Sequence, residues 1–272
     1  MLTTKHLLTA SAGFVAFGLM AANTHAATLL FDDFQDGTLG TATESGAVNG
    51  GFDTNSSDSG YTFVEENDFA KIEADGVKNS FREGSIRSSN TFDLTQGVIA
   101  TWDIAEVSWD NTSNGARLLL EVGNNSGIIG NSKSPNSFLL EFNRAGNELD
   151  ILAPDGSGGT ATLFDDSGAT LEGESGVTIV ATLDANGYEV DISTRTSSIS
   201  GTWSAGGADF DSISDANGLA NVAAGFMNKT NPGTSDDFLN IDSISVVAIP
   251  EPATAALIGV GGLLMLRRRS RA

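Results

Sequence analysis

The sequence contains no cysteine and only two histidines, His6 and His25, both near the N-terminus. Without cysteine the chain has no thiolate metal ligand and no cysteine nucleophile. If the first 26 residues are removed on export, as argued below, the remaining chain also lacks histidine. Ser-His-Asp catalysis and His-ligated zinc are then excluded, because both need an imidazole.

Basic residues are also scarce, with 14 Lys and Arg against 35 Asp and Glu and a formal net charge of −21 at pH 7. Five of the basic residues lie in the two terminal segments, so the part between them is more acidic still. Nucleic acid and anionic lipid are therefore excluded as partners of that part, because phosphate binding requires Lys and Arg. Divalent cations remain compatible with such a charge, which also serves solubility.

Long apolar runs are missing, but a short one lies near the N-terminus. Lys5 and His6 precede the apolar stretch Leu7 to Met20, and Thr24-His25-Ala26 ends in a small residue. This order is typical of a secretory signal peptide, residues 1–26, cleaved after Ala26. A transmembrane helix is the alternative, which the short length and the two glycines of the run disfavour.

The second apolar run lies at the C-terminus, from Ala253 to Leu266, and is followed by Arg267, Arg268 and Arg269. Its fourteen residues are fewer than the about 20 that a bilayer-spanning helix needs. A basic cluster beside an apolar segment stays cytoplasmic and places everything upstream outside. A plain membrane anchor is one interpretation of this tail.

The tail also resembles the PEP-CTERM sorting signal of Gram-negative bacteria. Pro250-Glu251-Pro252, the short apolar helix and the arginine cluster stand in the order of that signal. The resemblance implies that Pro250, Glu251 and Pro252 are recognised by an exosortase-type processing enzyme and that Arg267 to Arg269 stop the segment. It further implies transient anchoring in the inner membrane, delivery to the cell surface or extracellular matrix, and a link to exopolysaccharide. The membrane is then contacted only through residues 249–272.

Residues 27–248 show period-two alternation in many short runs, with 32 glycines and only five prolines in the whole chain. This pattern predicts an all-β sandwich or barrel in a single domain. Asp184-Ala185-Asn186-Gly187 predicts a hairpin, as do Arg144 to Asn147 and the Asp75-Gly76 pair. Ala42 to Gly60 and Ser204 to Gly218 are expected to be long loops.

The opening run of this domain, Leu29 to Phe34, holds Asp-Asp-Phe, and the closing run, Leu239 to Val246, holds Ile-Asp-Ser-Ile. With these two runs the domain resembles concanavalin-like jelly-roll sandwiches such as laminin-G-like and carbohydrate-binding modules. The resemblance implies an antiparallel jelly roll in which the first and last strands lie side by side.

A calcium site is the first candidate. Strand periodicity places Asp242 on the face of Ile244 and Val246, where a carboxylate needs a cation or hydrogen-bond donors. If the terminal strands pair, Asp32 or Asp33 approaches it, and carboxylates with backbone carbonyls suit a structural Ca²⁺. Alternatively, Asp242 caps a bulge through backbone N–H groups.

A polysaccharide site is the second candidate. Tyr61, Trp109 and Trp203 are the aromatic residues expected to contact sugar. Laminarinase-type hydrolases, which share the jelly roll, carry two glutamates around an aspartate on one strand, but Glu148-Leu149-Asp150 lacks the second glutamate. The favoured function is thus non-catalytic, a surface or matrix protein that binds polysaccharide; a glycan hydrolase or lyase is the alternative.

Overall fold

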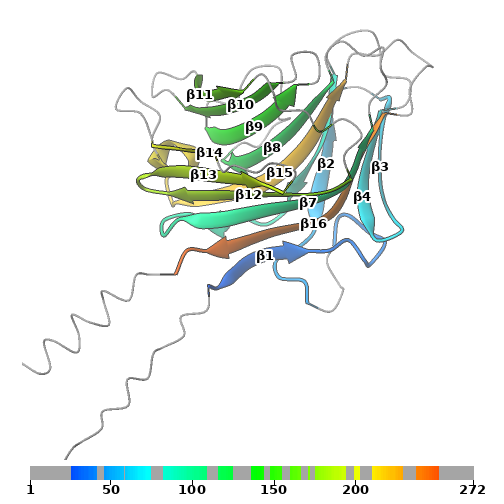
Figure 1. The fold of residues 1–272 in the computed structure, drawn as a ribbon. Helices are drawn as coiled ribbons and strands as arrows, with labels where there is room; N and C mark the ends of the chain where they lie inside the picture. Colours follow the sequence, from blue (N-terminus) through cyan, green and yellow to red (C-terminus); the bar gives the residue numbers. More distant parts are fainter. Residues whose placement is uncertain are drawn as a thin grey trace, which may run out of the picture.

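The alternating apolar residues form antiparallel strands, as Figure 1 shows. The computed structural model describes residues 26–41, 46–57, 59–74, 82–108, 116–124, 136–143, 148–154, 160–166, 171, 175–193, 199–202, 210–228 and 237–250. The elements in chain order are β1 (Thr28–Asp32), β2 (Phe52–Ser56), β3 (Tyr61–Glu66), β4 (Phe69–Ala74), β5 (Arg82–Ser88), β6 (Phe92–Asp93), β7 (Val98–Ser108), β8 (Arg117–Gly123), β9 (Ser137–Asn143), β10 (Glu148–Pro154), β11 (Thr160–Asp166), β12 (Ser175–Asp184), β13 (Gly187–Ile192), β14 (Ile199–Thr202), the 3-10 helix η1 (Phe210–Ile213), β15 (Leu219–Asn228) and β16 (Phe238–Ala248).

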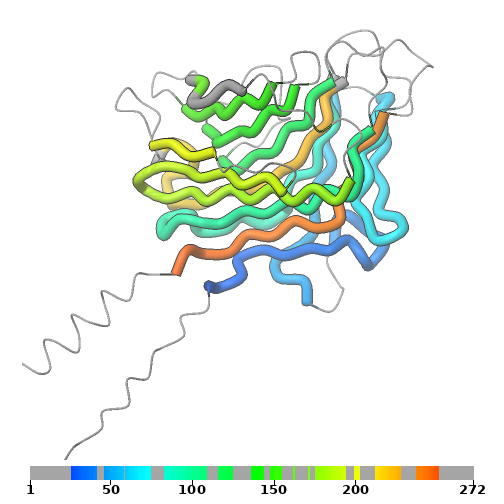
Figure 2. The backbone as a smooth tube through the Cα atoms, in the orientation of Figure 1, coloured from blue at the N-terminus to red at the C-terminus, as the bar shows by residue number. Residues whose placement is uncertain are grey.

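The strands form two sheets that pack face to face. Sheet A has the order β14-β13-β12-β7-β16-β4-β3, with β1 also paired to β16. Sheet B has the order β11-β10-β9-β8-β15-β5-β2, with β6 paired to β15. Every named pair is antiparallel, and β7 and β16 run side by side along most of their length (Figure 2). The predicted all-β sandwich is confirmed.

The first and last strands lie side by side, as the jelly-roll resemblance implied. Thr28 is opposite Val247 and Asp32 is opposite Ile244. The two ends of the domain therefore leave from one corner of sheet A. In the described part of the chain, no helix has the length and apolar character needed to cross a membrane.

The core lies between the sheets and is filled by large side chains. Trp102, from the middle of sheet A, is fully buried on the same apolar face as Val98, Ala100 and Ile104. Trp102 Nε1 donates a hydrogen bond to the backbone oxygen of Ala223 on β15 at 3.3 Å, so one side chain links the two sheets across the core.

Two of the predicted hairpins have clear outcomes. The hairpin at Asp184 is confirmed, because Asp184 is opposite Gly187 and its Oδ1 accepts hydrogen bonds from the N–H groups of Asn186 and Gly187. The pairing expected around Asp75-Gly76 is wrong: β4 belongs to sheet A and β5 to sheet B, so the chain crosses between sheets there. The turn residues themselves lie outside the described residues.

The predictions of two long loops are also partly wrong. Residues 42–60 contain β2, which pairs with β5. The polar sequence Phe52–Ser56 does not predict this strand, because its backbone hydrogen bonds come from the pairing with β5. Residues 204–218 contain η1. For residues 144–147 only the flanking pair is described, with Asn143 opposite Glu148, which fits the predicted hairpin.

Candidate functional site: the outward faces of the two sheets

The outward face of sheet B is a second buried layer. β8 and β9 are buried along almost their whole length on both faces, whereas β7 alternates between buried and half-buried residues. The outward side chains include a small apolar cluster and several polar groups, all nearly inaccessible: Leu119, Leu139, Leu152, Ala223 and Met227, with Glu83, Ser85, Glu121, Ser137 and Glu141. The outward face of an antiparallel sheet is commonly solvated. The buried side chains on this face of sheet B are therefore not ordinary surface residues.

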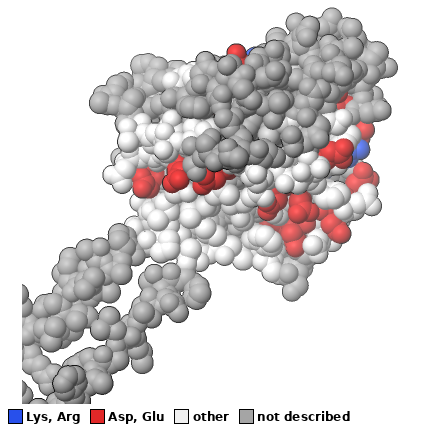
Figure 3. All heavy atoms as spheres, in the orientation of Figure 1, with Lys and Arg blue, Asp and Glu red and all other residues white. Residues whose placement is uncertain are grey.

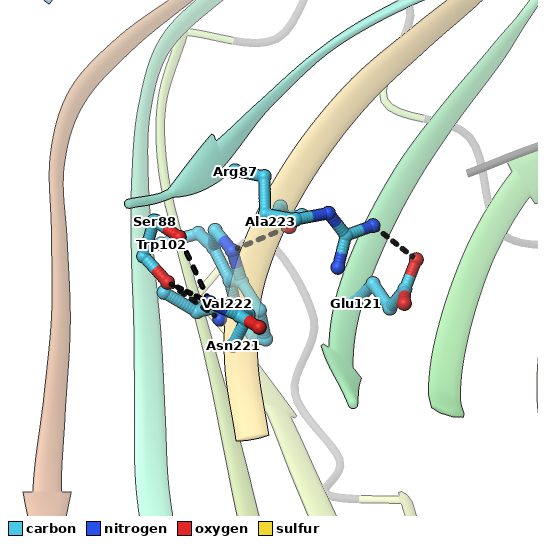
Figure 4. Close-up of polar contacts among 7 residues, drawn as sticks. All are labelled: Arg87, Ser88, Trp102, Glu121, Asn221, Val222 and Ala223. Carbon is cyan, nitrogen blue, oxygen red and sulfur yellow. Dashed lines mark hydrogen bonds and ion pairs between the residues drawn. The ribbon is translucent and has the colours of Figure 1, made fainter. Parts of the chain in front are cut away.

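Two ion pairs lie in this layer. Arg87 and Glu121 are opposite one another across Ala223, and their Nη2 and Oε2 atoms are 3.4 Å apart (Figure 4). Because Ala223 carries only a methyl group, the Arg87 side chain can reach across it to Glu121. Arg117 pairs in the same way with Glu141 on the neighbouring strand β9. The Glu121 side chain is fully buried, so its charge depends on this guanidinium.

Ser88 and Asn221 extend the polar contacts toward the end of β5. Asn221 Nδ2 donates to the backbone oxygen of Ser88 at 2.8 Å, and Ser88 Oγ accepts from the N–H of Val222 (Figure 4). These bonds secure the strand whose carbonyl at Ala223 receives the Trp102 indole.

The carboxylates of this layer do not suit glycoside hydrolysis. Glu121 and Glu141 lie on adjacent strands and face the same way, but each is bound to an arginine. A guanidinium partner favours the ionised carboxylate, while a glycosidase needs one carboxylic acid that holds its proton. The arrangement therefore stabilises the sheet and does not favour the hydrolase alternative.

The outward face of sheet A is open by contrast, and it carries a shallow hollow at the β12-β13-β14 edge. The hollow measures about 220 Å³ and includes Thr182, Tyr188, Glu189 and Ser200 in its lining. Thr182, Glu189 and Ser200 are opposite one another on the three strands. Hydroxyl and carboxylate groups in one row can exchange several hydrogen bonds with a sugar.

Tyr188 lies behind the hollow, on the inner face of sheet A, where it is opposite Leu183 and Gly201. The side chain is buried, its ring packs against Phe138 with centroids 5.5 Å apart, and burial raises the pKa of its hydroxyl. A Cβ at Gly201 would collide with the Tyr188 ring, so the glycine admits the ring beneath β14. The strand that carries Glu189 is thus held from the core side by Tyr188, whose phenol stays protonated at neutral pH.

Asp32 has a structural role in this fold. It is buried, and its two carboxylate oxygens accept hydrogen bonds from the N–H of Phe34 at 3.0 Å and of Gly51 at 2.7 Å. Phe34 has a positive φ of 53°, which is unusual for a bulky residue. The Asp32 cap holds that turn, so Phe34 can pack against Phe52 in the core.

The predicted placement of Asp242 among Ile244 and Val246 is wrong. The register between β16 and β7 shifts between Ile241 and Ser243, and Asp242 is the extra, exposed residue of this bulge. The bulge puts Leu239, Ile241, Ile244 and Val246 all on the buried side. Period-two reasoning cannot foresee this, because one inserted residue reverses every later side chain.

These positions do not fit the predicted calcium ion. Asp242 is exposed, and both oxygens of Asp32 already accept backbone hydrogen bonds. Asp33 is only half-buried. Within the described ranges, no group of three or more His, Cys, Asp or Glu side chains is arranged to hold a metal.

The aromatic candidates have separate outcomes. Tyr61 is only 7% exposed and stacks with Phe63 over Gly84, so it is a core residue and not the exposed sugar contact that was predicted. Trp109 and Trp203 lie outside the described residues, directly after β7 and β14. Of the sorting motif only Pro250 is described, and it is exposed; Glu251, Pro252 and Arg267 to Arg269 lie outside.

The sequence analysis missed the buried charges Arg87, Glu121 and Glu141, as well as Glu189 in the hollow. A weak signal existed for two of them: Leu118-Leu119-Leu120 and Leu139-Leu140 place adjacent leucines beside Glu121 and Glu141, which breaks period two. Such runs indicate strands buried on both faces.

Comparisons with known proteins support the fold. No known family profile matches the sequence, and no curated relative matches it. Among solved structures, the chain is similar to lectin II from Ulex europaeus, with a TM-score of 0.53 at 10% identity over 82% of this chain and 99% of that one. It is also similar to the carbohydrate recognition domain of Emp47p, with a TM-score of 0.52 at 13% identity over 81% and 94%.

A third similar structure is the exoplasmic/lumenal domain of VIP36 in its Ca²⁺/Man-bound form, with a TM-score of 0.51 at 11% identity over 85% and 92% of the two chains. Identities this low show the fold alone. The chain therefore has a lectin-like jelly-roll sandwich.

Proposed function

We propose that this protein is exported by a Gram-negative bacterium and binds polysaccharide at the cell surface or in the extracellular matrix, without catalysis. The observation that carries the proposal is the row Thr182, Glu189 and Ser200, which lines a hollow on the outward face of a lectin-like sandwich. The solved structures with similar folds include a lectin and a carbohydrate recognition domain.

The chemistry of the hollow favours a neutral glycan. Its ionisable carboxylates come from Asp184 and Glu189, and the chain carries a net charge of −21. Uronate or sulfate groups would be repelled by this field. Its volume of about 220 Å³ is below the range of about 300–1,000 Å³ typical of drug-sized ligands, which suits one sugar ring of a longer chain.

The binding experiment uses residues 27–248 on an array of neutral and anionic polysaccharides. We expect retention on neutral glycans and about tenfold weaker binding for Glu189→Gln, since about 1.4 kcal/mol corresponds to a factor of ten and charged hydrogen bonds contribute about this much. Asp191→Asn is the matched control, because Asp191 is exposed on the same strand and face but does not line the hollow. Equal binding by the Glu189 variant would exclude the hollow, and no retention on any glycan would overturn the function.

Export and sorting form the second part of the proposal. The signal peptide of residues 1–26 and the tail of residues 249–272 support it through their order of apolar, Pro-Glu-Pro and basic parts. Replacing Arg267, Arg268 and Arg269 together by neutral residues should stop sorting by an exosortase-type enzyme and leave the folded domain intact. Surface fractionation with a trypsin-resistance assay checks both points, and normal surface delivery of the variant would contradict the role of the arginines.

A further inference from the structure

An uncharged patch lies where the two ends of the domain meet. On the outward face of sheet A, Val247 is opposite Ile99, and Ser245 is opposite both Thr101 and Phe31. Val180 continues this row on β12, opposite Thr101. We call Phe31, Ile99, Thr101, Val180, Ser245 and Val247 the exit patch. All six are partly exposed, and four of them are apolar.

The exit patch differs from the surface around it. Glu189 and Asp191 line the next strand beyond β12, and Asp103 lies one row further along β7. Figure 3 shows white surface near the start of β1 and the end of β16, with acidic groups on either side of it. A charge-free area in a chain with 35 acidic residues indicates a contact that disfavours carboxylates.

The tail begins almost at the patch. The N–H of Ala248 is bonded to the oxygen of Ala27 at 2.9 Å, and the N–H of Ile249 to that of Gly97 at 3.1 Å. The sheet therefore holds the chain up to Ile249, and the apolar run starts at Ala253. At 3.3–3.6 Å per extended residue this connection spans roughly 14 Å at most. A headgroup layer is itself about 6 Å thick.

We propose that the exit patch rests against the lipid headgroups while the tail holds the protein in the membrane. This inference rests on the transient membrane anchoring that the resemblance of the tail implies, and it is independent of the glycan site. Anionic lipids repel the acidic remainder of the domain, so the uncharged corner is the surface that faces them. A second copy is a poorer occupant, because six partly exposed residues fall well below the about 800 Å² per partner of a stable interface.

The absence of cysteine makes the test clean, since a single introduced thiol is the only one to label. Residues 27–272 carrying Ser245→Cys are labelled with a polarity-sensitive fluorophore and reconstituted into phosphatidylcholine vesicles. Asn55→Cys, exposed on β2 of the other sheet, is the control. We expect a blue shift and quenching by headgroup-level quenchers at Ser245 and neither at Asn55. Adding Val180→Asp should abolish the Ser245 shift without changing flotation.

The outcomes separate the two proposals. A chain that floats with the vesicles while both labels report water overturns the exit patch alone. A chain that does not float overturns the attachment, and this inference with it. A Ser245 blue shift that grows with protein concentration without vesicles assigns the patch to contact between copies, which also overturns the lipid contact.

Discussion

The outward faces of the two sheets accommodate polar side chains in different ways. The outward residues of sheet A are partly exposed, and several of them carry hydroxyl groups. In one row, Asp103 accepts hydrogen bonds from the hydroxyls of Thr178 and Ser243 at 2.7 and 2.8 Å. Sheet B buries its outward residues along β8 and β9, although those of its edge strand β2 are exposed, and it pairs arginine with glutamate among leucines. The same residue type therefore has a very different energetic weight on the two faces.

The largest expected effect comes from breaking the buried pair. Glu121→Ala should lower the free energy of unfolding by about 3–5 kcal/mol, because the buried Arg87 charge loses the carboxylate opposite it. Urea denaturation measures the change. The double variant Arg87→Met/Glu121→Leu should recover most of the loss, since apolar replacement of both partners is nearly neutral. A loss below about 1 kcal/mol for the single variant would mean that the pair behaves as a surface one.

A larger side chain at position 223 tests how much space lies between Arg87 and Glu121. Ala223→Leu should cost about 1–3 kcal/mol, because its methyl group lies between Arg87 and Glu121 in a closed layer. Thr101→Leu is the matched change on sheet A, in a central strand of a half-open face. It should alter stability by less than about 0.5 kcal/mol. Equal costs in thermal unfolding would show that the two faces are packed alike.

The hydroxyl row of sheet A should matter less. Asp103→Ala removes the acceptor of Thr178 and Ser243, and we expect a loss of about 1 kcal/mol because water can replace the bonds at a half-exposed position. The measurement is the same urea series, with Asp191→Asn as an exposed control on the same face. A loss as large as that of Glu121→Ala would remove the contrast between the faces.

The smallest effect concerns pH at the edge of sheet A. Burial chiefly raises the pKa of Glu65, with nearby Asp36 adding to the rise, although the N–H of Gly37 bonds to its Oε1 at 2.6 Å. A raised folded pKa contributes stability that is complete below the unfolded value near 4.5 and is lost as pH rises through the folded value. Glu65→Gln should therefore raise the melting temperature at pH 7 and lose this advantage at pH 4.

Glu66→Gln, on the exposed neighbour in β3, serves as the control for the pH series. A Glu65 variant that gains nothing at neutral pH would show that the Gly37 hydrogen bond outweighs the burial of the charge.

The sequence by itself determined the class of the fold. Alternation in runs such as Val177 to Leu183 and the Asp-Ala-Asn-Gly turn are local properties, because strand faces and positive-φ turns depend on neighbouring residues. They predicted β12 and the hairpin to β13 correctly, whereas the pairing of the terminal strands was implied by the jelly-roll resemblance. The absence of cysteine likewise excluded thiolate metal sites and cysteine nucleophiles without any structure.

Only the tertiary structure decided which outward residues are buried and where alternation slips. Glu121 and Asp242 are both acidic residues that directly follow an apolar one, yet Glu121 is buried beside Arg87 and Asp242 is exposed in a bulge. Arg87 and Glu121 are separated by 34 residues, and the row of the hollow combines three strands. Such neighbours arise from strand order and register, which the sum of many weak packing contacts selects and which no local pattern records.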